Sequence, residues 1–195
     1  MNTIKLITLA FILLVGSAYT NETDQYDDLR KQSNEAFTYG EQLKYRVHYG
    51  WINAASVDVN VAEKPVKVNG RSTYQVSAYG KTFRSFDWAF RVRDHFISYI
   101  DSQSVAPLKY WKKVEEDNYR DEDLVYYDHD KKKLKGKKKD MDMPAYLQDI
   151  VSSIFYARTI DFQNAATGQS FPVNIYLDQE IYDLKFKYIG KETIK

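Results

Sequence analysis

The stretch FTYGEQLKYRVHYGWINAASVDVNV, residues 37–61, has the alternation of a β-hairpin. Apolar and polar residues alternate over residues 43–49 and again over residues 56–61, which is the period of a strand with one buried face. Gly50 lies between the two segments and predicts the turn. We expect the alternating apolar residues of both strands to form one wall of the fold: Leu43, Tyr45, Val47, Tyr49, Val57, Val59 and Val61.

The same alternation recurs along the rest of the chain, over residues 72–78, 94–100, 108–115, 119–128, 171–177 and 181–188. Turn-forming pairs such as Lys64-Pro65 and Asn69-Gly70 separate the first of these segments. Short connections between successive strands favour a meander. We therefore expect a mainly β fold, with one antiparallel sheet that is strongly curved or forms an incomplete barrel.

Two segments depart from strand alternation. Residues 81–93 are dense in aromatic residues, of which Phe83, Phe86 and Phe90 have helical spacing, so we expect a short helix or a tight loop. Residues 147–158 predict one amphipathic helix packed across the concave face of the sheet. Its apolar face would contain Leu147, Ile150, Val151, Ile154, Phe155 and Arg158, opposite Gln148, Asp149, Ser152 and Ser153.

The N-terminal segment has the pattern of an export signal. Lys5 precedes an apolar run that ends in Gly16-Ser17-Ala18, so residues 1–18 predict a signal peptide cleaved after Ala18. The run is short for a membrane span, which disfavours an uncleaved anchor. We expect a periplasmic or secreted protein without a stable transmembrane span, in which residues 19–35 form a flexible leader and 36–195 a single β-rich domain. A strand begun so near Lys195 also predicts C-terminal truncation.

Composition narrows the classes of partner and site. The chain has no cysteine, which excludes disulfides, thiolate metal sites and cysteine nucleophiles. The formal net charge of +1 disfavours nucleic acid or any other partner that binds the whole protein electrostatically. Aromatic residues make up 15% of the chain and are mostly tyrosine, which suits half-buried sheet faces.

Several short motifs, taken in order, resemble one known family. They are Tyr39-Gly40-Glu41-x-Leu43-x-Tyr45, Tyr49-Gly50, Val92-Arg93-Asp94, Tyr99-Ile100-Asp101, Pro107 and Gln148-Asp149-Ile150-Val151-Ser152-Ser153. In order and spacing the chain resembles the bacterial exported family called domain of unknown function 3108, from about Ala36 to the C-terminus. The resemblance implies a secreted or periplasmic β protein that continues past a strand like 182–189. It supplies no catalytic residues.

No pattern of catalytic or metal-binding residues stands out. His48, His95 and His129 lack metal-ligand spacing, and no nucleophile elbow, phosphate loop or dinucleotide glycine motif occurs. We therefore expect no catalytic residues, no metal and no cofactor. Arg93-Asp94 is a candidate structural ion pair, since it lies between aromatic residues.

Residues 130–139 concentrate positive charge. One interpretation is a solvated hairpin or edge strand whose lysines pair across strands with the acidic runs 121–123 and 128–130. The other is contact with an anionic surface, formed by headgroups or polyanionic glycans. The lysines are Lys131, Lys132, Lys133, Lys135, Lys137, Lys138 and Lys139.

Three functional hypotheses follow, led by a binding protein. A curved sheet covered by one helix leaves an apolar groove, so the first is a protein that binds a lipid or another hydrophobic or amphiphilic envelope ligand. The second is a structural or assembly protein of the envelope that binds another protein or an anionic glycan, and an enzyme is third. The candidate groove residues are Tyr45, Val47, Val57, Val59, Phe86, Trp88, Ile150, Ile154 and Phe155.

Overall fold

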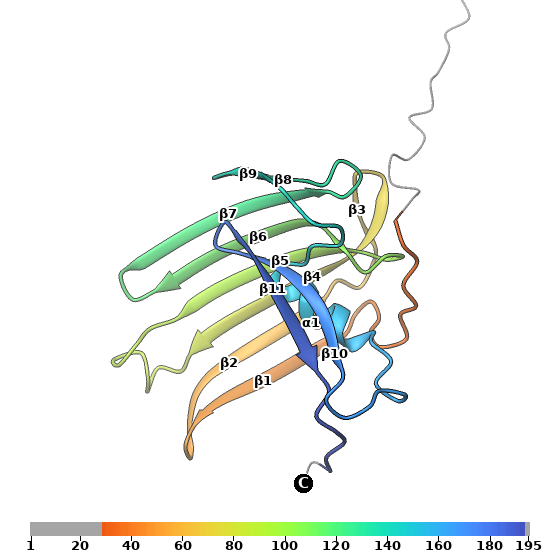
Figure 1. Ribbon diagram of the computed structural model, residues 1–195. Helices are drawn as coiled ribbons and strands as arrows, with labels where there is room; N and C mark the ends of the chain where they lie inside the picture. Colours follow the sequence, from red (N-terminus) through yellow and green to blue (C-terminus); the bar gives the residue numbers. More distant parts are fainter. Residues whose placement is uncertain (1–28, 194–195) are drawn as a thin grey trace, which may run out of the picture.

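A nine-stranded antiparallel sheet dominates the structure, a computed structural model that describes residues 29–193 (Figure 1). Its neighbour order is β1-β2-β4-β5-β6-β7-β8-β9, and β3 pairs with β4 beyond the end of β2. The strands are β1 (Gln42–Tyr49), β2 (Ile52–Val61), β3 (Val66–Val68), β4 (Arg71–Thr82), β5 (Arg93–Asp101), β6 (Pro107–Glu116), β7 (Tyr119–Asp128), β8 (Lys133–Gly136) and β9 (Asp140–Asp142). The sheet is curved and does not close into a barrel, as expected.

The hairpin predicted for residues 37–61 forms. Leu43 lies opposite Val59 and Tyr45 opposite Val57, so the apolar residues of both strands share one face. Gly50 supplies the turn with a φ of 60°, a conformation that glycine adopts without strain. The register shifts after Val47, which bends β1 near its end.

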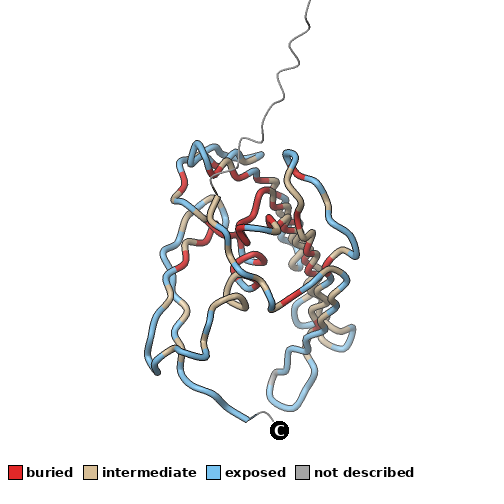
Figure 2. Tube along the Cα trace, turned by 90° about the vertical axis from the view of Figure 1, so that its right-hand side faces the viewer, coloured by how far each residue is buried: buried red, intermediate tan, exposed pale blue. Residues whose placement is uncertain are grey.

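A second layer covers the concave face of the sheet. It consists of the helix α1 (Ile150–Arg158) and the hairpin of β10 (Ser170–Leu177) and β11 (Glu180–Lys187), which cross the sheet in Figure 1. Figure 2 shows buried stretches in the middle of the molecule and exposed ones around its rim. The fold is therefore an open curved sheet with one helix and one hairpin packed on it.

Polar contacts fix the hairpin to the sheet. The buried Lys112 on β6 pairs with Asp121 of β7 at 2.9 Å and with Asp178 in the β10–β11 turn. The hydroxyl of the buried Tyr176 donates a hydrogen bond of 2.8 Å to the carboxylate of Asp123. Because Lys112, Asp123 and Tyr176 are buried, these contacts hold β10 in one position.

The helix is shorter than predicted, and its buried side includes the polar residues that were expected to face solvent. It starts at Ile150 rather than Leu147, because the backbone of Gln148 pairs with β10 through bonds to Asn174 and Tyr176. The predicted polar residues Gln148, Asp149, Ser152 and Ser153 are each at most 2% exposed. Leu147, Val151 and Phe155 of the predicted apolar face are buried as well. The apolar Ile150 and Ile154 are instead 36% and 54% exposed.

A capping box explains the burial of the polar residues. The carboxylate of Asp149 accepts hydrogen bonds from the backbone N–H groups of Val151 at 2.9 Å and Ser152 at 2.8 Å. The Ser152 hydroxyl accepts one from the Asp149 N–H at 2.8 Å. The second carboxylate oxygen of Asp149 accepts a bond of 2.6 Å from the hydroxyl of Ser98 on β5, so the cap anchors the helix to the sheet.

Residues 83–92 form a loop rather than a helix, and they correct the predicted Arg93–Asp94 pair. Arg93 pairs with Asp87 of this loop at 2.7 Å instead of with its neighbour Asp94. The Asp94 carboxylate accepts a hydrogen bond of 3.0 Å from the backbone of Glu115. Adjacent residues on a strand point to opposite faces, so Arg93 and Asp94 serve different partners.

The N-terminal segments predicted from the sequence lie largely outside the described residues. The predicted signal peptide and residues 19–28 of the predicted leader are among those not described. Within the described part of the leader, the backbone N–H of Gln32 donates to the carbonyl of Gln103 at 2.8 Å. In the described part of the chain no helix is long and apolar enough to cross a membrane.

Candidate functional site

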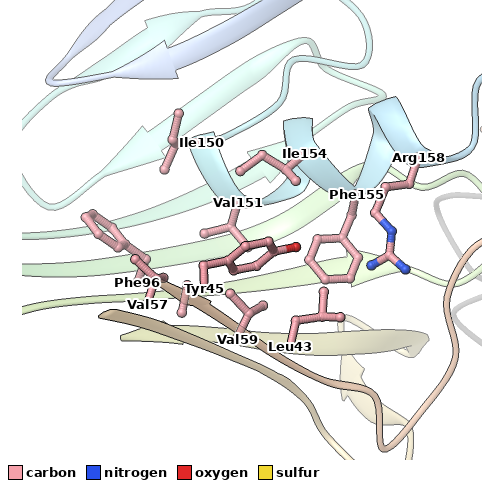
Figure 3. Close-up of a pocket in the computed structure, with 11 residues that line it drawn as sticks. Leu43, Tyr45, Val57, Val59, Phe96, Ile150, Val151, Ile154, Phe155 and Arg158 are labelled. Carbon is pink, nitrogen blue, oxygen red and sulfur yellow. The ribbon is translucent and has the colours of Figure 1, made fainter. Parts of the chain in front are cut away.

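An apolar groove of about 440 Å³ lies between α1 and the adjoining half of the sheet. Figure 3 shows side chains of β1, β2 and β5 forming its floor beneath the side chains of the helix. Packed protein interiors contain few voids larger than one water, so a space of this volume is not ordinary packing. The lining residues are Leu43, Tyr45, Val57, Val59, Ala78, Phe96, Ile150, Val151, Ile154, Phe155 and Arg158.

The orientation of the helix creates this groove. With Asp149 and Ser152 turned into the protein, the apolar residues Ile150 and Ile154 lie over the space in front of β1 and β2. Tyr45, on the edge strand, is 51% exposed and borders the same space. Apolar side chains therefore line the groove and also form its open side.

An ion pair closes one end of the groove. The guanidinium of Arg158 binds the carboxylate of Glu41 through two hydrogen bonds of 2.8 and 2.7 Å, and it donates another of 2.6 Å to the carbonyl of Ala36. The hydrogen bonds that Arg158 donates to Glu41 raise the pKa of Arg158, and burial opposes this effect. The charge of Arg158, the one ionised lining residue, is therefore already compensated within the protein.

The sequence model of one family, described as a protein of unknown function (DUF3108), matches residues 44–195. The chain belongs to the DUF3108 family. The match spans the second layer of this DUF3108 protein and nearly all of the groove, from β1 onward. No curated protein and no solved structure matches the chain.

Six of the nine candidate groove residues of this DUF3108 protein line the groove: Tyr45, Val57, Val59, Ile150, Ile154 and Phe155. The other three do not. Val47 is exposed beyond the lined part of β1, and Phe86 and Trp88 belong to the loop of residues 83–92 at the end of β4. Period-two and helical spacing locate the groove's walls, but they do not tell which end of a strand the helix covers.

Five lining residues were absent from the candidate set. Leu43, Val151 and Arg158 had been placed on the correct faces by their spacing, so that signal was available. Ala78 on β4 and Phe96 on β5 also lie in segments with a period-two pattern. Their contribution depends on strand order, since β4 and β5 continue the floor beside β2.

Lysines of the lysine-rich segment form salt bridges with nearby acidic residues. Lys138 pairs with Asp121, Lys137 with Glu122 at 3.9 Å and Lys131 with Asp128 at 3.2 Å. Lys133 pairs with Asp142 of the neighbouring strand β9. Because at least four of the seven lysines have acidic partners, much of the positive charge is compensated locally.

Asp149 is the carboxyl group that most resembles a functional one. Burial raises its pKa to about 6, against the opposing effect of hydrogen bonds from Ser98, Ser152 and Val151. Perturbed carboxyls are common in active sites. This one is fully buried and its oxygens are occupied by the cap, so the geometry assigns it a structural role.

The remaining candidate chemistry is similarly sparse. Among residues 29–193, no group of three or more histidine, aspartate or glutamate side chains is arranged to hold a metal ion. The imidazole of His129 is buried and bonds to the carbonyl of Pro107 at 2.7 Å, whereas His95 bonds to Ser77 at 2.8 Å. Burial lowers the pKa of both histidines, which is the expected effect on a cation removed from water.

Proposed function

We propose that this DUF3108 protein is an exported, non-enzymatic binding protein that holds a hydrocarbon chain of an envelope amphiphile in the groove beneath α1. The observation that carries the proposal is the orientation of the helix. It buries Asp149 and Ser152 and leaves Ile150 and Ile154 over an apolar space. A helix that only completed a core would bury its isoleucines, because each buried aliphatic side chain contributes about 1.5–3 kcal/mol.

The lining selects for unsubstituted hydrocarbon. All lining residues except Arg158 have aliphatic or aromatic side chains, and the one hydroxyl among them belongs to the half-exposed Tyr45. A hydroxyl or amide group of a ligand would lose its water without a partner there, which costs about 1–3 kcal/mol per group. The polar part of the ligand therefore stays outside.

The volume fits one chain. At about 30 Å³ per water-sized group, 440 Å³ holds on the order of 10 to 15 methylene-sized groups. Burying 10 methylenes contributes roughly 8 kcal/mol before the costs of association are subtracted. We expect micromolar or weaker affinity for a single-chain amphiphile.

The two ends of the groove orient the ligand. Because Glu41 already compensates Arg158, an anionic headgroup gains little by entering that end. The side bounded by Tyr45 and Ile154 is open to solvent. We expect the chain to lie along the helix, with its headgroup at the open side.

The exported location rests on the predicted signal peptide. Residues 1–18 have the charge, apolar run and small-residue end of such a signal. Fractionation of cells that express the full chain tests this part of the proposal. A mature protein that begins at Tyr19 and lies in the periplasmic or secreted fraction is expected, whereas a cytoplasmic, uncleaved chain would contradict it.

Filling the groove should abolish binding without unfolding the protein. Ile154→Trp places a larger side chain over the groove from a half-exposed helix position, and Val57→Phe does so from the floor. We expect each variant to bind dansyl-labelled undecanoic acid at least tenfold more weakly than the wild type. Fluorescence titration measures this affinity.

Leu184→Trp is the matched control. Leu184 is 50% exposed like Ile154, but it lies on β11 and does not line the groove. Its variant should bind the dansyl probe with wild-type affinity. Equal affinity for the probe in Ile154→Trp, Val57→Phe and the wild type would show that the groove is not the binding site.

A further inference from the structure

Three loops of the sheet lie at the same end of its strands. Ala55 near the start of β2 pairs with Thr82 at the end of β4, and Val92 before β5 bridges to Glu116 at the end of β6. The corresponding hairpin ends lie along one side of the sheet in Figure 1. We call these loops the tip loops: residues 50–51 between β1 and β2, 83–92 between β4 and β5, and 117–118 between β6 and β7.

Exposed aromatic side chains gather on and beside the tip loops. Trp51 is 92% exposed and Trp88 is 86% exposed, and Phe90 and Tyr119 are also exposed. Single exposed apolar residues are ordinary, but several large ones at one end of a molecule mark a contact surface. Packing in the core of the sheet does not explain why these aromatic residues are present, because their side chains are exposed.

The conformation of the loop of residues 83–92 holds the ring of Trp88 outward. The indole N–H of Trp88 donates a hydrogen bond of 2.8 Å to the carbonyl of Ser85 in its own loop. Asp87 anchors the same loop by pairing with Arg93 at 2.7 Å. Trp88 is thus displayed on a loop that is tied to the sheet.

We propose that the tip loops dock on a lipid bilayer, with Trp51 and Trp88 inserted at the level of the headgroups. Tryptophan and tyrosine favour this interface because their rings combine an apolar body with a polar group. Separate projecting tips suit insertion between lipids, whereas a protein partner would be met by a contiguous patch.

The charges of the tip loops agree with this partner. Arg84 is exposed on the same loop as Trp88. Arg120 instead lies 4.0 Å from Glu115 and donates to the carbonyls of Asp117 and Tyr119. The acidic residues of these loops are engaged within the protein: Asp87 pairs with Arg93, and Asp117 accepts a bond of 2.8 Å from the backbone of Arg91. Exposed arginine beside tryptophan suits phosphate groups above an apolar layer.

The docking surface is continuous with the groove. Val47 on β1 is exposed, and it lies between Trp51 and Tyr45 on the face of the strand that borders the groove. The opposite end of the groove is closed by Arg158 and Glu41. Docking at the tips would place the open side of the groove near the bilayer, although the docking itself does not depend on an occupied groove.

Vesicle binding by tip variants tests the proposal. We expect the wild type to sediment with sucrose-loaded vesicles of equal parts phosphatidylcholine and phosphatidylglycerol. The double variant Trp51→Ala/Trp88→Ala should partition into the vesicles at least tenfold more weakly, because it lacks both rings that insert. It should still fold, because neither side chain packs in the fold. In a Trp111→Phe background, the fluorescence of the remaining Trp51 and Trp88 should shift to shorter wavelength on vesicle addition.

Two controls separate the tips from other surfaces. Tyr126→Ala removes an exposed ring from β7, away from the tip loops, and should bind vesicles like the wild type. Lys132→Gln/Lys135→Gln/Lys139→Gln removes three charges of the lysine-rich segment and should also leave binding unchanged. Binding that survives the tip substitutions, or that is lost only with the lysines, would overturn the proposal.

Other outcomes also distinguish the two proposals. Ile154→Trp should still bind vesicles, and Trp51→Ala/Trp88→Ala should still bind dansyl-labelled undecanoic acid in solution. Failure of only one assay therefore identifies which proposal is wrong. A wild type that ignores vesicles but forms dimers sensitive to Trp51→Ala/Trp88→Ala would contradict membrane docking and assign the tips to a protein contact.

Discussion

The free energy of unfolding of Asp149→Ala should be about 3 kcal/mol lower than that of Asp149→Asn. Asparagine keeps an oxygen that accepts the N–H bonds of Val151 and Ser152, whereas alanine removes the cap, which is worth about 1 kcal/mol. Alanine also leaves the buried hydroxyl of Ser98 without its partner, at about 1–3 kcal/mol. Urea denaturation of both variants measures the difference.

The same residue should make stability depend on pH. Burial raises the pKa of Asp149 in the folded protein to about 6, above its ordinary value of 3.8, so the fold favours the protonated form. This contribution is fully present below about pH 4 and is lost as the pH rises to about 6. Relative to Asp149→Asn, the wild type should lose on the order of 3 kcal/mol over that range.

Subtracting the variant isolates this effect from other carboxyl groups. The pKa of Asp121 is lowered to about 2, because its bonds to Lys138 and Lys112 outweigh burial, and its contribution has the opposite sign. Both proteins share it, so it cancels in the difference. A wild type and Asp149→Asn that run parallel from pH 4 to 7 would show that Asp149 is not buried as an acid.

Asp101→Asn should destabilise the protein by about 3–5 kcal/mol, because it breaks a buried ion pair and leaves a charged partner behind. The Asp101 carboxylate is 1% exposed and binds Arg71 through bonds of 2.7 and 2.9 Å. It also accepts bonds of 2.8 Å from the backbone and the hydroxyl of Ser104, so it fixes the β5–β6 turn.

The pKa of Asp101 agrees with a structural role for this carboxylate. Burial alone would raise it, but bonds from Arg71 and Ser104 outweigh burial and hold the pKa below its ordinary value. Asp58→Asn is the matched control, because Asp58 pairs with the exposed Lys44 at 3.3 Å and surface pairs contribute at most about 1 kcal/mol. Equal urea midpoints for the two variants would contradict a structural role for the Arg71–Asp101 pair.

The strands were predictable because their alternation is local. The shared face of Leu43, Tyr45, Val57 and Val59 follows from period two. The register that pairs Leu43 with Val59 also depends on the shift after Val47. The faces of the helix were not predictable in this way. Asp149 and Ser152 are polar in any scale of hydrophobicity, and their burial depends on Ser98, which is 51 residues distant in sequence.

The same distinction applies to the candidate site. Tyr45, Val57 and Ile154 were placed in the groove by local spacing, but Phe96 joins them only through strand order. Trp88 was assigned to the groove because it is aromatic, whereas the loop carries it to the end of the sheet. Hydrophobicity alone does not tell a lining residue from an exposed tip residue.

Native mass spectrometry of the exported protein, purified without detergent, tests the central claim most directly. We predict one bound amphiphile per chain in the wild type. Ile154→Trp should lack it and Leu184→Trp should retain it, because Ile154 lines the groove and Leu184 does not. A wild type without added mass, even after incubation with lipid vesicles, would contradict the account. A bound mass that persists unchanged in Ile154→Trp and in Val57→Phe would contradict it equally.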